Sequence, residues 1–173
     1  GKMSPDEVST LLRTELGKSL DDAYKTLDGI SADLPKGLEL SPDGINRAVK
    51  GVTNKTTGTP KSAPSELPDN ITRLIRSGTT RKTAEGIEQV SPNVNWYEGL
   101  IREIRQTRTA HKFAPDPTSG GADHYLENLA RLESAALRTL GRAAEAQSSH
   151  GQVTAFYKLA DDIAGRFYQG PVG

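Results

Sequence analysis

The hydrophobic side chains of this chain recur every three or four residues along most of its length, and this spacing predicts helices. Ser4-Pro5-Asp6-Glu7 places a capping serine, a first-turn proline and a capping-box glutamate ahead of the first apolar stripe. We predict that this first helix ends at Gly17 and that Ser19 caps a second one. A third helix, made marginal by its glycines, is predicted to begin at Ser41-Pro42-Asp43.

The middle of the chain is interrupted by residues 53–70, TNKTTGTPKSAPSELPDN, which contain three prolines and few large apolar side chains. This composition is typical of a linker or a long irregular loop. After it, Asp69 or Asn70 is predicted to cap a short helix that ends at Gly78. One or two further helical turns are predicted within residues 83–90, and no segment shows the alternation typical of a strand.

The stretch VNWYEGLIREIRQTRTAHKF, residues 94–113, contains the only tryptophan of the chain and is predicted to form one helix. At about 100° per residue, its apolar side chains share one arc, formed by Val94, Tyr97, Leu100, Ile101 and Ile104. Trp96 lies at the edge of this arc, and Arg102 and Arg105 lie beyond it. Arg108 falls inside the arc, so we expect the helix to end near this residue.

Two long amphipathic helices are predicted in the last third of the chain, over residues 122–147 and 153–170. The stripe of the first consists of Tyr125, Leu129, Leu132, Ala136, Leu140 and Ala143. Because the joint between the two helices is short, we expect them to pack as antiparallel neighbours. The pattern predicts an all-α fold, with smaller helices in residues 1–53, a linker or irregular loop at 54–70, and a three- or four-helix antiparallel bundle in residues 71–173.

Composition narrows the class of protein. The 173 residues include no cysteine, which excludes disulfides and thiolate metal sites. No apolar run approaches the roughly 20 residues that cross a bilayer, and no hydrophobic signal segment follows Lys2. We expect a soluble protein in the cytoplasm of the producing cell, and secretion without a cleavable signal, or into a host, stays open. Gly1-Lys2-Met3 is consistent with a cloning remnant, in which case the chain would be a fragment, and both interpretations stay open.

The formal net charge is zero, but the charges are unevenly distributed along the chain. Residues 1–53 carry 7 basic and 9 acidic side chains, residues 54–113 carry 10 and 6, and residues 114–173 carry 5 and 7. A neutral chain is unlike a dedicated nucleic-acid-binding domain, whereas its basic middle keeps that alternative open. Residues 79–104 are also similar to a helix–turn–helix, with a turn at Ser91-Pro92 that lacks the usual central glycine.

No pattern in the sequence marks a catalytic, cofactor or metal site. The chain has no Gly-x-Ser-x-Gly elbow and no phosphate-binding loop. His124 and Glu127 have a spacing that suits two ligands of one metal, but matching carboxylates elsewhere are missing. We therefore predict no catalytic residue, no cofactor and no metal.

Two carboxylates have predicted arginine partners. Glu98 precedes Arg102 by four residues, the favourable order for a pair on a helix surface. Glu133 instead falls within the apolar arc of its helix, among Leu129, Leu137 and Leu140. We interpret Glu133 as a rim residue or as a carboxylate paired with an arginine of a neighbouring helix. The alternative is an uncovered patch at which an arginine of a partner docks.

We interpret the chain as a non-catalytic helical module that binds another protein through a helix face. It would be one domain of a larger bacterial, phage or viral protein that acts as an adaptor, an effector or an assembly subunit. The alternative is a nucleic-acid-binding domain that uses the basic central region. Tryptophan beside arginine is typical of interface hot spots, so the predicted partner-binding residues are Trp96, Arg102, Arg105, Arg108, Lys112, Arg81 and Lys82. The oligomeric state stays open.

Overall fold

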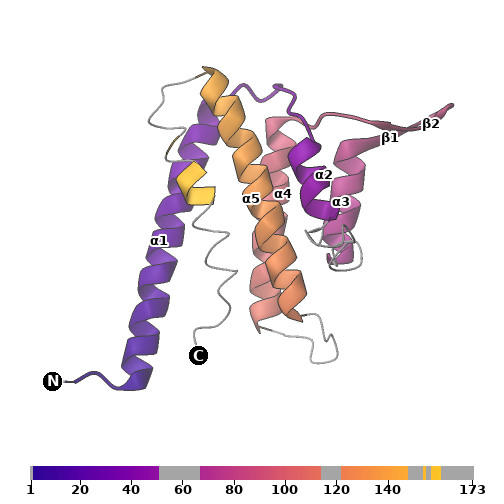
Figure 1. The fold of residues 1–173 in the computed structure, drawn as a ribbon. Helices are drawn as coiled ribbons and strands as arrows, with labels where there is room; N and C mark the ends of the chain where they lie inside the picture. The colour runs from indigo at the N-terminus through magenta and orange to yellow at the C-terminus, as the bar shows by residue number, and fades with distance from the viewer. Residues whose placement is uncertain (1, 51–66, 114–121, 148–153, 155–156, 161–173) are drawn as a thin grey trace, which may run out of the picture.

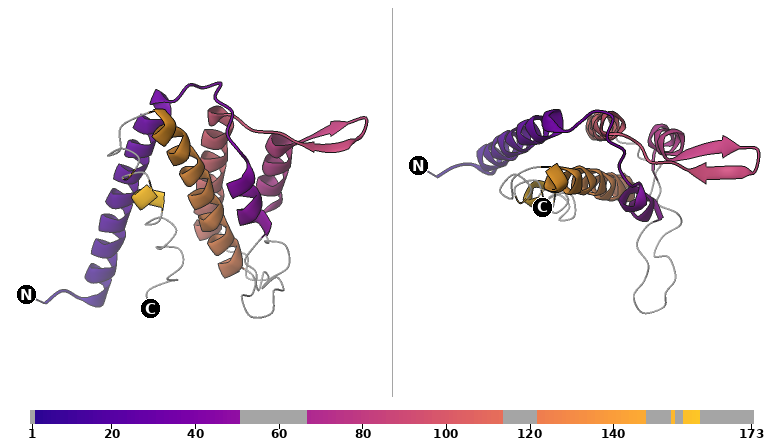
Figure 2. Two further views of the ribbon diagram at one scale, coloured as in Figure 1. Left: turned by 45° about the horizontal axis from the view of Figure 1, so that its top comes forward. Right: turned by 90° about the horizontal axis from the view of Figure 1, so that it is seen from above.

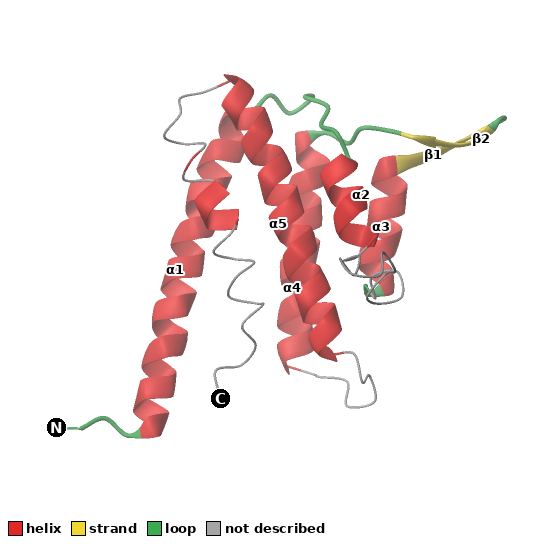
Figure 3. Cartoon of the chain, in the orientation of Figure 1, coloured by secondary structure: helices red, strands yellow, loops and turns green. Residues whose placement is uncertain are grey.

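The computed structural model describes residues 2–50, 67–113, 122–147, 154 and 157–160, and these are predominantly helical. The elements are α1 (Pro5–Asp33), α2 (Asp43–Lys50), α3 (Asp69–Thr79), β1 (Thr80–Thr83), β2 (Gly86–Gln89), α4 (Val94–Phe113) and α5 (Ala122–Gln147). At the centre, α4 and α5 lie side by side and run in opposite directions, with α2 and α3 on one side and α1 on the other (Figure 1). The two strands form a hairpin that leaves the helical body, as Figures 2 and 3 show.

The first helix, α1, is continuous over 29 residues, where the sequence pattern predicted two helices. It begins as predicted, with Pro5 in its first turn and Ser4 Oγ accepting a hydrogen bond from Glu7 N at 3.2 Å. The predicted end at Gly17 is wrong. A glycine commonly ends a helix by adopting a left-handed conformation, and among the described residues only Gly86 has a positive φ. Gly17 therefore weakens α1 by about 1 kcal/mol relative to alanine without ending it.

The short helix α2 begins at Asp43, as the triplet Ser41-Pro42-Asp43 predicted, and it packs closely against α5. Ile45 is fully buried in this contact. A Cβ atom added to Gly44 would lie 3.3 Å from Thr139 Oγ1 of α5. The glycine that lowers the helix propensity of α2 thus lets its backbone approach α5, and packing stabilises the helix.

The third helix begins at Asp69, and the predicted cap from Asp69 or Asn70 is wrong. The residue before the helix is a proline, which makes no side-chain cap. Asn70 points its amide toward α4 instead, where Nδ2 donates hydrogen bonds of 2.9 Å to Glu103 and Thr107. The side chain is therefore used between helices and not at the helix end. Residues 51–66, which form most of the predicted linker, lie outside the described residues.

The helical turns predicted within residues 83–90 are wrong, because β1 and β2 pair there as an antiparallel hairpin. Its turn is held by Thr83 Oγ1, which accepts a hydrogen bond from Glu85 N at 3.3 Å and donates one to Gly86 O at 3.1 Å. Gly86 has a φ of 130°, which a residue with a side chain rarely adopts. These local features favour a turn over a helix. The helix–turn–helix interpretation is wrong for the same reason, since a hairpin occupies the place of its first helix.

The buried arcs predicted for α4 and α5 are confirmed. In α4, the five arc residues named from the sequence are each at most 3 % exposed. In α5, the stripe from Leu129 to Ala143 is buried, while the side chain of Tyr125 lies outside the described residues. α1 and α2 contribute to the same hydrophobic core through Tyr24, Leu27, Ile30, Leu34 and Ile45. The predicted last helix falls largely outside the described residues, of which Ala160 is fully buried.

Candidate functional site

The residues predicted to contact a partner fall in several places and do not form one surface. Arg81 and Lys82 lie on β1, Trp96 packs against α3, Arg102 and Arg105 line a cavity beside α1, and Arg108 is an internal residue. Lys112 belongs to α4, but its side chain lies outside the described residues. Each place is built differently, and each can support a different role.

The hairpin carries all its strand side chains in solvent, and Ile87 is 75 % exposed. Arg81 and Glu88 stand opposite each other in the register and form an ion pair of 2.7 Å, and Lys82 stands opposite Ile87. The base of the hairpin is attached to the helical body by Val90 N, which donates a hydrogen bond of 2.9 Å to the carbonyl oxygen of the buried Thr79. Within the described part of the chain, neither strand has a second neighbour. Both edges therefore offer unpaired backbone groups.

Trp96 lies against the end of α3, close to where the hairpin begins. A Cβ atom added at Gly78 would lie 2.0 Å from Trp96 Nε1, so the indole fills the space of a side chain at that position. The glycine is therefore needed for close approach, and α3 passes it and ends at Thr79, one residue after the predicted end. Trp96 also meets the Tyr97 ring edge-on, with centroids 5.0 Å apart. As predicted, Trp96 is only partly buried at the edge of the core.

A cavity of about 340 Å³ opens between the C-terminal part of α1 and the middle of α4. Arg102 and Arg105 line it together with Glu98, whose carboxylate lies 2.7 Å from Lys36 Nζ and also accepts a hydrogen bond from Ser31 Oγ. The predicted ion pair between Glu98 and Arg102 is wrong, because the carboxylate turns toward α1. Burial acts to raise the pKa of Glu98, but these two hydrogen bonds and the neighbouring positive charges outweigh it and lower the pKa.

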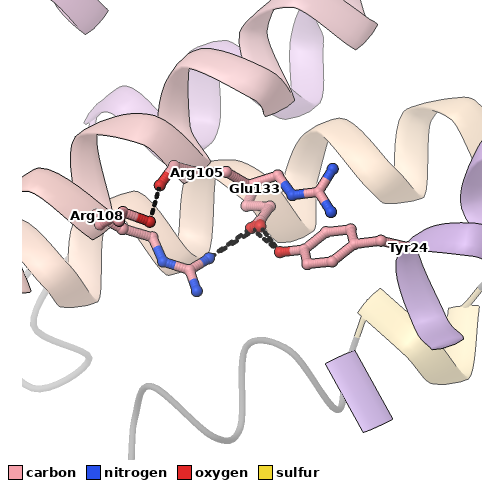
Figure 4. A network of polar contacts seen from close by, with 5 residues as sticks. Tyr24, Arg105, Arg108 and Glu133 are labelled. Atoms are coloured by element: carbon pink, nitrogen blue, oxygen red, sulfur yellow. Dashed lines mark hydrogen bonds and ion pairs between the residues drawn. The ribbon is translucent and has the colours of Figure 1, made fainter. Parts of the chain in front are cut away.

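A buried polar network joins α1, α4 and α5 (Figure 4). Glu133 of α5 is fully buried, and its two carboxylate oxygens lie 2.7 and 2.9 Å from Arg108 Nη1 of α4. The hydroxyl of Tyr24 from α1 donates to the same carboxylate. The guanidinium of Arg105 lies over the Tyr24 ring, 3.1 Å from its centroid. The interpretation of Glu133 as a carboxylate paired with an arginine of a neighbouring helix is confirmed.

Arg108 occupies the apolar arc of α4, as the sequence indicated, but the predicted end of the helix at this residue is wrong. The helix continues to Phe113, because Glu133 of the facing helix α5 neutralises the charge of Arg108. The Arg108 side chain is only 13 % exposed. Its guanidinium is thus occupied within the fold, which does not fit the predicted role of Arg108 in binding a partner.

The electrostatics of the network keep Tyr24 protonated. Burial raises the pKa of Tyr24, and the adjacent Glu133 carboxylate raises it further. Burial also raises the pKa of Glu133, while Arg108, the Tyr24 hydroxyl and Arg105 act in the opposite direction. Since the carboxylate is buried and its oxygens are hydrogen-bonded, the network presents no reacting atom to a substrate. Its geometry suits the docking of α1 on α4 and α5.

The sequence pattern alone identified one half of this network. Glu133 was recognised because a carboxylate interrupts an apolar stripe, but Tyr24 was not identified as its partner. The available signal was that Tyr24 is the only aromatic residue before Trp96 and carries a hydroxyl. A buried tyrosine hydroxyl needs a partner, and a buried carboxylate needs donors.

Among the described residues, no group of three His, Asp or Glu side chains is arranged to hold a metal ion. The side chain of His124, considered above as a ligand, lies outside them. None of the described helices combines the length and the apolar character needed to span a membrane. Neither a protein-family model, nor a curated protein, nor a solved structure matches the chain significantly.

Proposed function

We propose that this chain is a non-catalytic helical module that binds another protein, with the β1–β2 hairpin as its docking element. The observation that carries the proposal is the complete exposure of the hairpin, including Ile87 at 75 %. A two-stranded hairpin without a packed face is only marginally stable in water. Proteins usually protect open strand edges and large exposed apolar side chains unless a partner covers them.

The chemistry of the hairpin indicates the kind of partner segment that suits it. An extended segment can add a third strand to either edge through main-chain hydrogen bonds. Ile87 and Lys82 stand opposite each other across the strands, so they present an apolar and a cationic contact on one face. A segment with an apolar residue beside an acidic one complements this face.

The predicted partner-binding residues divide accordingly. Arg81 and Lys82 belong to the docking element, and Trp96 stabilises the end of α3 from which the hairpin leaves. Arg102 and Arg105 serve a secondary contact at the cavity beside α1. In this proposal α2 to α5 act as the platform, which includes α2 (Asp43–Lys50) in addition to the helices of the bundle predicted in residues 71–173. The origin from a larger bacterial, phage or viral protein, and the location in the cytoplasm, belong to this proposal.

The test is a capture experiment with Ile87→Asp as the variant. Because Ile87 packs against no core, its substitution should change the free energy of unfolding by no more than about 0.5 kcal/mol. Proteins from an extract of the producing cell that bind the native chain should be lost from the variant, as measured by quantitative mass spectrometry. A matched variant on α3, Arg73→Asp, should retain them. Equal capture by Ile87→Asp and the native chain would refute the hairpin as the docking element.

Nucleic-acid binding is the second candidate, and the adjacent cations Arg81 and Lys82 on an exposed hairpin favour it. It is weaker because Arg81 is paired with Glu88 at 2.7 Å and the chain as a whole is neutral. If nucleic acid is the partner, retention on a duplex or a single strand should fall steeply with salt. Reversal of the charges of Arg81 and Lys82 should then abolish retention.

A further inference from the structure

A groove between α2 and α5 is lined by four arginines. Its volume is about 450 Å³, and its lining consists of Gly44, Arg47, Arg131, Ser134, Ala135, Arg138, Thr139 and Arg142. Three of the arginines share one face of α5, because steps of seven and four residues return a helix to the same side. The fourth, Arg47, comes from α2. Residues far apart in the sequence therefore converge on one concave surface.

The shape of the groove follows from the small residues on its floor. The close approach of α2 at Gly44 places its backbone against Thr139, whose hydroxyl donates to Ala135 O at 2.8 Å. Ser134 is 7 % exposed and lies beside these residues. Large side chains here would fill the space between the helices. Small residues instead leave a channel with long arginine side chains along its walls.

The charge of the groove is one-sided. None of the described residues that line it is acidic, although the chain as a whole has a net charge of zero. Arg131 forms an ion pair of 3.1 Å with Glu127, four residues earlier on α5. Arg142 lies within hydrogen-bonding reach of the Tyr157 hydroxyl. Arg47 and Arg138 have exposed side chains. Guanidinium groups of like charge repel one another in the free protein, and an anionic ligand would relieve this repulsion.

We propose that this groove binds an acidic segment of a partner protein, with the arginines gripping its carboxylates. The inference rests on the proposed function, since it names the chemistry of a protein partner, but it concerns a surface separate from the hairpin. Arginine matches a carboxylate with two parallel hydrogen bonds, which makes it suited to such a segment.

The spacing along α5 favours an elongated ligand over a single small anion. At about 1.5 Å of rise per residue, Arg131 and Arg138 lie about 10 Å apart along the axis, and Arg138 and Arg142 about 6 Å. Carboxylates on every second residue of an extended segment are about 6.6 Å apart, which is close to the step from Arg138 to Arg142. Single-stranded nucleic acid is less suited, because the described lining offers no aromatic side chain on which bases stack.

The experiment measures the fluorescence anisotropy of a labelled peptide of ten glutamates with the full chain at several salt concentrations. The groove variant is Arg47→Glu with Arg142→Glu. The matched control is Arg73→Glu with Arg76→Glu on α3, which changes the net charge equally and lies outside the groove. We expect the peptide to bind the native chain more weakly as salt rises. The groove variant should weaken binding by about tenfold or more, and the control by about twofold or less.

Equal weakening by both double variants would overturn the proposal, because net charge alone would then explain binding. Failure of the peptide to bind the native chain would overturn it as well, and so would binding of an oligothymidylate of equal charge in place of the peptide. If the groove variant does not fold, Arg47→Gln with Arg142→Gln replaces it, with the same expectation of weaker binding. Ile87→Asp should bind the peptide like the native chain. Unchanged partner capture by Ile87→Asp, with the peptide still bound by the groove, therefore refutes the hairpin proposal alone. Loss of capture by Ile87→Asp, with no binding of the peptide to the native chain, refutes the groove alone.

Discussion

The two sides of α5 hold arginines in opposite circumstances. On the side that faces α1 and α4, the buried carboxylate of Glu133 binds Arg108, and Arg105 stacks on Tyr24 (Figure 4). On the side that faces α2, an open groove is lined by Arg47, Arg131, Arg138 and Arg142, without a carboxylate among the described lining residues. The same residue type thus stabilises the fold on one side and remains accessible to a ligand on the other. Burial distinguishes the two roles, because Arg108 is enclosed beside a buried carboxylate whereas Arg47, Arg138 and Arg142 are exposed.

The energetic consequences of the two arrangements differ because of desolvation. A buried ion pair loses its hydration, so removal of one member leaves a charge that neither water nor protein compensates. An exposed arginine keeps its hydration, and its substitution changes stability little. The comparison therefore predicts large effects on folding for one side of α5 and small effects for the other.

The largest expected effect is that of Glu133→Ala. It leaves the largely buried Arg108 without its carboxylate and should lower the free energy of unfolding by about 3–5 kcal/mol, as measured by urea denaturation. The control is the double variant Glu133→Met with Arg108→Leu, which removes both charges and should recover most of this loss. If the double variant is as unstable as Glu133→Ala, then packing and not the unpaired charge sets the cost.

Truncation of the α4 core should cost nearly as much. Leu100 and Ile104 are fully buried, so Leu100→Ala or Ile104→Ala should lower the free energy of unfolding by about 2–5 kcal/mol. The exposed neighbour Arg102 serves as the control, since Arg102→Ala should change it by no more than about 0.5 kcal/mol. A loss at Arg102 as large as that at Leu100 would show that this arginine is structural and place the proposed secondary contact elsewhere.

Arg105 is intermediate between the buried arginine that stabilises the fold and the exposed arginines whose substitution changes stability little. Its guanidinium covers the Tyr24 ring, so Arg105→Ala should cost about 0.5–2 kcal/mol, more than Arg102→Ala on the same helix. Thermal unfolding of both variants measures this difference. In a Tyr24→Leu background the cost of Arg105→Ala should disappear. Its persistence there would mean that Arg105 stabilises the chain through another contact.

The smallest effect concerns the pH dependence of stability through Glu98. Its pKa is lowered below the ordinary value near 4.5 in the folded chain, so the unfolded chain binds a proton more readily. The contribution of Glu98 to stability is therefore present above the unfolded pKa and is lost as the pH falls through the folded pKa. Glu98→Gln, and separately Lys36→Met, should flatten this part of the profile of unfolding free energy against pH. An unchanged acid limb in both variants would contradict the assignment.

The comparison also shows what the sequence could predict. The arcs of α4 and α5 followed from periodicity, because each long helix buries one face and its apolar residues therefore recur at helical spacing along many residues. The pairing of Glu133 with an arginine followed from a carboxylate in an apolar stripe, but Arg108 could not be named, since its position was taken as the end of α4. Arg47 and the arginines of α5 were not recognised, because a groove depends on how closely two helices approach at Gly44.

Local backbone features explain the remaining differences. The sequence pattern predicts helical turns in place of the hairpin, because β1 and β2 are short and exposed on both faces and neither shows apolar alternation. The turn at Thr83–Gly86, with its threonine hydrogen bonds, was the signal that competed with helical spacing. Gly17 was taken for a helix end, although glycine ends a helix only where the backbone turns. In these places the residue's helix propensity predicted the secondary structure less well than the local backbone conformation did.

The most direct test of the division between the two sides of α5 is urea unfolding with and without the ten-glutamate peptide. Three proteins are compared: the native chain, Arg108→Ala, and Arg47→Ala with Arg142→Ala. The groove variant should unfold like the native chain but gain only about 1.4 kcal/mol or less from the peptide, while the native chain gains about 2.7 kcal/mol at a hundredfold excess over its Kd. The free energy of unfolding of Arg108→Ala should be several kcal/mol lower than that of the native chain, and the peptide should still raise it. If the groove variant unfolds as early as Arg108→Ala, or if the peptide stabilises all three equally, the division is contradicted.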